Sequence, residues 1–379
     1  MKLNQSLLAA ALGLGVASLS HAGNVYFTGS TAARSVVYQA LTNAGTVFTT
    51  QPTTTLYNGG GSGANYMAFS GTLVGGSGTT VIKCHWSGSE AGVLDVASNS
   101  IVSETFIADS LLDGTDHGSA VPASFDTHAV DLAMADNAQT FSRTRTPSLT
   151  GTEVCVITFK WVRNKGLWTG TNVTDSMIRQ AFLGFCPRAV FDGNPADVND
   201  FVYVSGRDNQ SGTRVNTFGD TGFGIFSSPN QIEMNSSGVM QLINGNYAGD
   251  FGFSSGGTLA GTLGADTTAQ ADNWNSTTGY SVIAYLGVGD AATAITAGAT
   301  ELAYNGVPFS SAAVKEGTYT FWGNEYIFKS ASVGSEAQSI FTKLAATTGI
   351  NNFADGTKTV KLTDMHCSRP GPTGDPSHN

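Results

Sequence analysis

Short apolar runs alternate along the chain with segments of helical spacing, and small polar residues separate the two. The run 24–28 (NVYFT) predicts a strand; it is followed by the turn 29–31 (GST) and by the helically spaced segment AARSVVYQAL. A second predicted strand, 80–86, ends at the polar turn 87–92 (SGSEAG), and a short helix follows it. A third, 201–205 (FVYVS), leads into another polar stretch. This recurring order of strand, small turn and helix predicts an α/β architecture.

The remaining pattern adds elements of both kinds. Residues 44–80 are rich in Thr and Gly with short alternating runs, which predicts an antiparallel excursion. Residues 103–127 are polar and show no clear period. Apolar runs predict further strands, and amphipathic spacing predicts two further helices. Thr174 is expected to cap the helix that it begins. The strands are expected at 130–136, 153–162, 280–288 and 319–328, and the helices at 174–183 and 335–346.

The polar turns are the candidate chemistry. In open α/β sheets, ligands bind outside the carboxyl ends of the strands, where helix N-termini converge. Several such turns meeting in a cleft would present many N–H and O–H donors, which suits a tetrahedral oxyanion. The stretch 205–218 (SGRDNQSGTRVNTF) also places Arg207 before a Ser-Gly-Thr set. The alternative for each turn is a plain helix N-cap, although a bulky cation in a capping turn needs a partner.

Composition narrows the classes of function. Charged residues make up 12% of the 379, hydrophobic residues 41%, and the net charge is −10. A disordered chain would carry more charge and fewer aromatic residues, and a nucleic-acid partner would need a basic face, so we expect neither. The acidic balance does not exclude a small anion held by backbone N–H groups and one arginine. Phosphate-loop, zinc-protease and EF-hand motifs are absent from the sequence, and we expect no cofactor and no metal. Lys83 and Arg34 are interpreted as surface charges, and Trp161, Trp168 and Trp322 as core residues.

The first 22 residues predict export. Lys2 is followed by an apolar run from Leu7 to Leu19 and by a small-x-small end at Ala22, a pattern typical of a cleaved secretory signal. We therefore expect a soluble protein of the periplasm or the extracellular space. Export and an even cysteine count favour one or two disulfides, with three possible full pairings and buried free thiols as the alternative. The four cysteines are Cys84, Cys155, Cys186 and Cys367.

The order of the turns carries a resemblance. The motifs GSTAAR, SGSEAG, LAMAD, RDNQSGTR and GYSVIAYLG follow one another as in the periplasmic phosphate-binding protein family of ABC transporters, which this sequence resembles. The resemblance covers most of the chain, leaving out roughly residues 44–78 and the tail from Cys367. Each motif is short, and the order and coverage give the resemblance its weight.

The resemblance implies an α/β, two-lobed type II periplasmic-binding-protein fold with mixed sheets and an antiparallel β insertion in lobe one. Lobe one would hold residues 23–157 and 287–379, and lobe two residues 158–286. Two hinge crossover strands would lie near 153–162 and 280–288. The implied partners are phosphate or a related oxyanion and a membrane ABC permease or a sensor, and the protein would act as a monomer.

Site residues follow from the same resemblance, position by position. Asp136 matches the family's aspartate, which accepts a proton from a monohydrogen anion, and Arg207 matches its arginine. The implied hydroxyl and N–H donors are Ser30, Thr31, Ser89 or the adjacent Ser87, Ser211, Gly212 and Thr213. Two positions depart from the family. The family usually has an aspartate two residues after the arginine, where this chain has Asn209, and the acid here is Asp208, one residue earlier. The family also usually has a serine before the aspartate that matches Asp136, where this chain has Ala135.

Two other classes of protein stay open. Residues 252–256 (GFSSG) fit the G-x-S-x-G pattern of a serine hydrolase, with Ser254, Asp290 and His366 in the order of a triad. A pattern with three fixed positions arises easily in a chain with 47 glycines, and we expect no enzyme. Ser254 and Ser255 could instead line the cleft. The Thr- and Gly-rich residues 44–80 would also suit an exported structural or adhesive β-protein, although the strand–helix order elsewhere does not.

Overall fold

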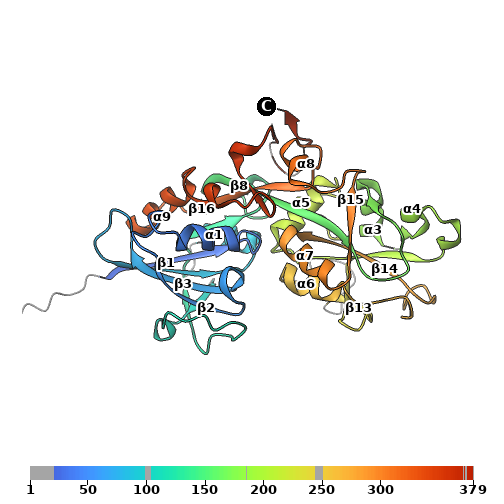
Figure 1. The fold of residues 1–379 in the computed structure, drawn as a ribbon, viewed down its shortest axis with the longest axis horizontal. Helices are drawn as coiled ribbons and strands as arrows, with labels where there is room; N and C mark the ends of the chain where they lie inside the picture. Colours follow the sequence, from blue (N-terminus) through green and yellow to red (C-terminus); the bar gives the residue numbers. More distant parts are fainter. Residues whose placement is uncertain are drawn as a thin grey trace, which may run out of the picture.

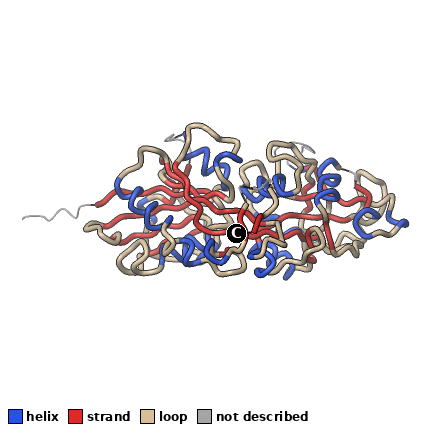
Figure 2. The backbone as a smooth tube through the Cα atoms, turned by 90° about the horizontal axis from the view of Figure 1, so that it is seen from above, coloured by secondary structure: helices blue, strands red, loops and turns tan. Residues whose placement is uncertain are grey.

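A computed structural model describes residues 21–98, 104–184, 186–243, 251–369, 371 and 374–378. The predicted signal segment lies outside this range, apart from the backbone of His21 and Ala22, which begins the first strand. Within the described residues, no helix is both long and apolar enough to span a membrane. The chain forms two α/β lobes side by side, with strands through the middle and helices on both faces (Figures 1 and 2).

Lobe one is built on a mixed sheet in the order β8-β16-β7-β1-β4-β3-β2. The pairs β1–β7 and β1–β4 are parallel, whereas β2, β3 and β4 pair antiparallel and form the excursion expected at 44–80. The strands are β1 (His21–Gly29), β2 (Thr53–Tyr57), β3 (Tyr66–Thr72), β4 (Thr79–His85), β7 (Leu132–Ala135), β8 (Thr150–Arg163) and β16 (Trp322–Lys329). The helices are α1 (Arg34–Thr42), α2 (Ser89–Ser98) and α9 (Ser335–Ala345).

Lobe two uses the other half of the long strand β8. There β8 pairs antiparallel with β14 and β15, β11 pairs parallel with β14, and β10 closes the edge. Its strands are β9 (Asn172–Val173), β10 (Cys186–Pro187), β11 (Phe201–Ser205), β12 (Ile232–Met234), β13 (Met240–Leu242), β14 (Ser281–Gly287) and β15 (Thr300–Tyr304). Its helices are α3 (Asp175–Leu183), α4 (Ala189–Asp192), α5 (Gly212–Asp220), α6 (Gly256–Thr262), α7 (Val288–Thr296) and α8 (Ser311–Lys315).

The first crossing between the lobes lies in β8, as expected for residues 153–162: its N-terminal half pairs with β16 and its C-terminal half with β14. The second crossing differs from the expectation at 280–288. β14 lies inside the sheet of lobe two, and Ala291, Leu302 and Phe321 pack into the cores of that lobe. The chain therefore returns to lobe one at β16, because the apolar residues between 288 and 321 are buried against lobe two.

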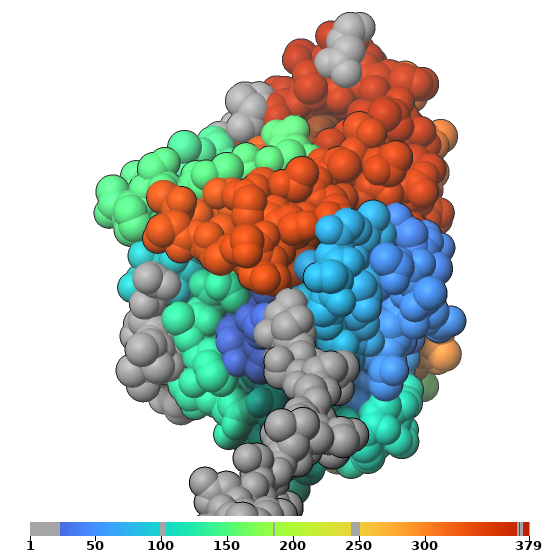
Figure 3. Space-filling model, turned by 90° about the vertical axis from the view of Figure 1, so that its left-hand side faces the viewer, coloured from blue at the N-terminus to red at the C-terminus, as the bar shows by residue number. Residues whose placement is uncertain are grey.

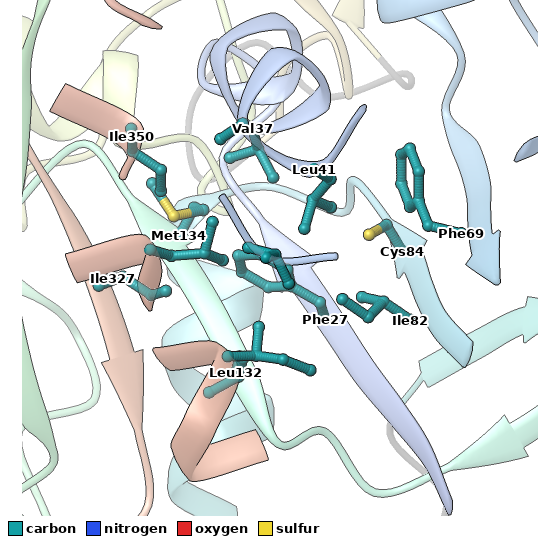
Figure 4. Packing of buried hydrophobic residues seen from close by; sticks show 14 of the residues in the cluster. Phe27, Val37, Leu41, Phe69, Ile82, Cys84, Leu132, Met134, Ile327 and Ile350 are labelled. Atoms are coloured by element: carbon teal, nitrogen blue, oxygen red, sulfur yellow. The ribbon is translucent and has the colours of Figure 1, made fainter. Parts of the chain in front are cut away.

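The core of lobe one combines the N-terminal part of the chain with later segments, from β16 to residue 350. Phe27 and Met134 on neighbouring strands face Ile327 of β16 and Ile350 from near the C-terminus, with Val37 of α1 packed above them (Figure 4). On the surface, blue segments from the N-terminal part of the chain likewise meet orange segments from the C-terminal part (Figure 3).

The expected disulfides are wrong, because all four cysteines are free and buried. Cys84 and Cys155 pack in the core of lobe one, and Cys186 and Cys367 pack in that of lobe two. Each thiol occupies an apolar position, where a cysteine acts as a small hydrophobic residue. Burial accordingly raises the pKa of the Cys186 thiol to about 11.

Two further differences from the sequence-based expectations concern residues 103–127 and Lys83. The polar segment 103–127 contains an antiparallel pair, β5 (Glu104–Ile107) with β6 (Phe125–His128), which its irregular pattern did not predict. Lys83 is not a surface charge: its side chain is fully buried, and its ammonium group lies 2.6 Å from Asp109 and 3.0 Å from Asp126. Towards the C-terminus the chain forms the short strands β17 (Thr359–Val360), β18 (Cys367–Ser368) and β19 (Ser377–His378), of which β17 pairs with β8.

Candidate functional site

Turns from both lobes meet at the carboxylate of Asp136, directly after β7. From lobe one, Ser30 Oγ donates a hydrogen bond to Asp136 Oδ1, and Ser89 Oγ donates to the same oxygen at 3.1 Å. From lobe two, Thr213 Oγ1 donates to Asp136 Oδ2 at 3.3 Å. These four residues form what we call the Asp136 cluster, and each is at most 3% exposed. The cluster thus gathers hydroxyl donors from three separate strand-to-helix or loop-to-helix turns.

Glycines allow the lobe-one turns to approach so closely. Gly29 has φ +113°, and a Cβ there would lie 2.0 Å from the carbonyl oxygen of Met134 on the paired strand β7. Ser30 then caps the next turn, since its Oγ accepts the N–H of Ala33 at 3.1 Å. A Cβ at Gly92 would lie 2.7 Å from Gly29 Cα, so α2 packs directly on the end of β1. These contacts hold Ser30 and Ser89 beside Asp136.

Lobe two contributes the N-terminal turn of α5. Ser211 is its N-cap, with Oγ accepting the N–H of Arg214 at 3.3 Å, which is the plain capping role. A Cβ on Gly212 would lie 2.3 Å from Ser89 Oγ and 2.8 Å from Asp136 Cβ, so only glycine fits against lobe one there. Asn216 strengthens the contact between the lobes, because its Nδ2 donates to the carbonyl oxygen of Asp136 at 2.8 Å.

A second carboxyl group, which the sequence did not indicate, lies behind Asp136. Glu325 on β16 is fully buried, and neither of its oxygens has a hydrogen-bond partner among the described residues. Burial raises the pKa of Glu325 well above its usual value, and the nearby Asp136 carboxylate raises it further. Both effects favour the protonated form of Glu325, and Asp136 is one of a pair of buried carboxyl groups.

Arg207 is anchored differently from the family pattern. Its Nε donates to the carbonyl oxygen of Phe253 at 3.0 Å, and its Nη2 to that of Ser254 at 2.8 Å. Asp208, the displaced acid, instead closes its own turn, with Oδ1 accepting the N–H of Gln210 at 3.1 Å. Two backbone carbonyls therefore orient the guanidinium, which lies 3% exposed on the side of the cleft that faces Asp290.

The remaining predicted site residues lie around the cleft rather than in the Asp136 cluster. Ser87 Oγ pairs with Thr28 Oγ1 at 2.7 Å and lines a broad inter-lobe cleft of about 1010 Å³, opposite Ser254 and Ser255. Thr31 lines a smaller adjoining pocket of about 200 Å³. Arg34, expected at the surface, lines both spaces, because α1 begins at the edge of the cleft.

The hydrolase arrangement is not assembled. Within the described residues, no hydrogen bond joins Ser254, Asp290 and His366. The carbonyl of Ser254 is occupied by Arg207, and Asp290 faces Arg34 and Arg207. His366 Nδ1 lies 2.5 Å from Glu316 Oε1, in an exposed pair. The described residues also contain no group of three or more His, Cys, Asp or Glu placed to hold a metal ion.

Two α/β lobes joined by crossing strands, with helix-opening turns converging between them, define the type II periplasmic-binding-protein architecture. Among solved structures, a protein of Clostridium perfringens assigned as a phosphate ABC transporter substrate-binding protein, with bound phosphate, shares this fold. It has a TM-score of 0.52 and 12% identity, over 89% of this chain and 99% of that one.

Two further similar structures have TM-scores below 0.5. PstS of Borrelia burgdorferi matches at 14% identity over 89% of this chain and 98% of its own, with a TM-score of 0.42. An ABC-type phosphate transport receptor of Vibrio cholerae matches at 11% identity over 86% and 94%, with a TM-score of 0.44. No protein-family model and no curated protein matches the sequence.

Proposed function

We propose that the protein is an exported solute-binding protein that captures an inorganic oxyanion, phosphate before others, between its two lobes. It acts in the periplasm or outside the cell and passes the anion to a membrane permease or a sensor, without a chemical step. The observation that carries the proposal is the Asp136 cluster, in which hydroxyl donors of both lobes surround one carboxylate. The shared fold of the phosphate-bound Clostridium perfringens protein supports the same assignment.

Asp136 supplies a way to choose among oxyanions. A carboxylate accepts a hydrogen bond from monohydrogen phosphate or arsenate, but it repels sulfate, which has no proton at neutral pH. Ser30, Ser89 and Thr213 donate to the unprotonated oxygens, and the N–H groups at the start of α5 add partial positive charge. The raised pKa of Glu325 favours its protonated form, which would keep a second negative charge away from the anion.

The test is isothermal titration of the protein with phosphate, arsenate and sulfate, beside an Asp136→Asn variant. We expect phosphate and arsenate to bind and sulfate to bind at least ~10-fold more weakly. Asp136→Asn should weaken phosphate ~10- to 100-fold, since hydrogen bonds to charged groups contribute about 1.5–3 kcal/mol.

The matched control is Asp266→Asn, which removes an exposed carboxylate of lobe two that lies 3.7 Å from Lys165. This control should bind phosphate as the unmodified protein does. If none of the three oxyanions binds, the proposed function is wrong. If sulfate binds tightly and phosphate does not, Asp136 does not accept a hydrogen bond from a protonated anion.

A further inference from the structure

The small pocket beside the Asp136 cluster has the properties of an anion site of its own. This Arg34 pocket has a volume of about 200 Å³ and lies where the two lobes join. The start of α1, strand β8 and the start of α7 all contribute to it. The lining residues that the argument uses are Thr31, Arg34, Ser35, Gly289, Asp290 and Lys358.

Positive charge is concentrated in this pocket. Arg34 is half-buried, and its guanidinium makes no side-chain hydrogen bond or close ion pair among the described residues, although it lies in the field of Asp290. Burial lowers the pKa of the Arg34 guanidinium, but an arginine remains charged in proteins. Lys358 lies across the first turn of α7, because a Cβ added to Gly289 would come 3.5 Å from its Cδ. Two cations therefore face a cavity in a chain whose net charge is −10.

The one carboxyl group in the pocket does not neutralise this charge. Asp290 is surrounded by Arg207, Arg34 and Lys358, each of which acts to lower its pKa. Burial outweighs them, and the pKa of Asp290 is raised above its usual value. Three cations against one carboxyl group leave an excess of positive charge even when Asp290 is ionised, and a bound anion would balance this excess.

Donor groups complete the pocket. Gly287, the N-cap residue of α7, makes no side-chain cap, so it leaves the first N–H groups of this nine-residue helix available to an anion. Thr31 and Ser35 add hydroxyl groups from the opposite wall. Cations with backbone and hydroxyl donors are the set that binds a phosphoryl group.

The Asp136 cluster and the Arg34 pocket adjoin. Ser30 belongs to the Asp136 cluster and Thr31 to the Arg34 pocket, and consecutive Cα atoms are about 3.8 Å apart. We propose that the Arg34 pocket is a second anion subsite, so that the preferred solute carries two linked phosphoryl groups, one held at Asp136 and one at Arg34. This inference rests on the proposed function, because it places the first group where phosphate is expected.

Titration with inorganic pyrophosphate and with phosphate, both without divalent metal, tests the second subsite. We expect pyrophosphate to bind at least ~10-fold more tightly than phosphate, the gain of one further charge-assisted contact. Arg34→Gln should remove this gain while changing phosphate affinity less than about 3-fold. Because Arg34 has no hydrogen-bond partner to lose, the variant should keep its melting temperature.

The matched control is Lys165→Gln, which removes one positive charge from a side chain 58% exposed on lobe two. It should leave both affinities unchanged. If phosphate binds and pyrophosphate binds no more tightly, the second subsite is refuted and the proposed function stands. If Arg34→Gln weakens both anions equally, Arg34 belongs to a single site and the inference is wrong. If neither anion binds to the unmodified protein, both proposals fail.

Discussion

Replacing Glu325 by glutamine would remove the buried carboxyl group behind Asp136 while keeping the size and polarity of the side chain. In the folded protein Glu325 is fully buried, and burial and the neighbouring Asp136 hold its pKa well above the usual range. In the unfolded chain the same group ionises with a pKa of about 4.3. Folding above that pH must therefore bind a proton at Glu325.

The size of the effect follows from proton linkage. Above pH ~5 the folded state holds one more proton at this position than the unfolded state, so stability falls as pH rises. The slope is about 1.4 kcal/mol per pH unit for as long as the folded carboxyl group stays protonated. If Glu325 stays protonated throughout, the protein should lose up to about 2.7 kcal/mol between pH 5.5 and 7.5 through this group alone. Glu325→Gln does not titrate, so its stability should rise relative to the unmodified protein by this amount.

Urea unfolding at pH 5.5, 6.5 and 7.5 measures the difference. The comparison uses only the pH dependence of the difference in free energy of unfolding between the two proteins. A constant cost of accommodating the amide therefore cancels. Glu336→Gln is the control, because Glu336 is near the surface, where among the described residues its Oε2 accepts the hydroxyl of the adjacent Ser335, at 2.9 Å. If the difference in free energy of unfolding between Glu325→Gln and the unmodified protein stays constant over this pH range, Glu325 does not hold a proton in the folded state.

Three further predictions concern other parts of the chain. Gly212→Ala should weaken phosphate binding at least ~10-fold in titration, because its Cβ would meet Ser89 and Asp136, whereas Gly261→Ala, with open space around it, should not. Burial and the neighbouring Glu104 raise the pKa of Asp95 to about 7, so this group should lower the stability of the protein as pH rises from about 4 through 7. Asp95→Asn should therefore melt at a higher temperature than the unmodified protein at pH 8 but not at pH 4. Thiol titration of the denatured, unreduced protein should find four reactive groups per chain, and a reductant should leave the melting temperature unchanged; a lower count would contradict the buried free thiols.

Local features of the sequence predicted most of the elements that form the Asp136 cluster. β1, β4 and β11 are apolar runs, and small polar residues that can turn the chain end each of them. Thr174 was predicted as a helix cap, and its hydroxyl accepts the N–H of Met177. Such features are written in neighbouring residues, because strand period, turn chemistry and capping act within a few positions.

Features that depend on distant partners could not be predicted in this way. Glu325 lies in an aromatic strand, and nothing in its neighbours shows that Asp136, far away in the chain, faces it. Arg34 follows the predicted turn in a helix, where a charge is commonly solvated, and only the position of α7 turns it into the wall of a pocket. Cys84 and Cys155 were counted as disulfide candidates, although each lies in an apolar run that predicts burial.

The contacts of Asp136 indicate which hydrogen bonds between the lobes an entering anion would replace. The hydroxyls of Ser30, Ser89 and Thr213 already donate to the Asp136 carboxylate, which occupies the donors that an oxyanion needs. Entry of an anion must therefore break the bonds from these hydroxyls to Asp136, among them the bond from Thr213, which joins the lobes. The entering oxyanion can take over both halves of that bond, because its oxygens accept from Thr213 and its proton donates to Asp136. Binding then replaces the direct hydrogen bond between Thr213 and Asp136 by two hydrogen bonds through the anion. An anion without a proton cannot donate to Asp136, so it would leave this carboxylate without the hydrogen bond from Thr213.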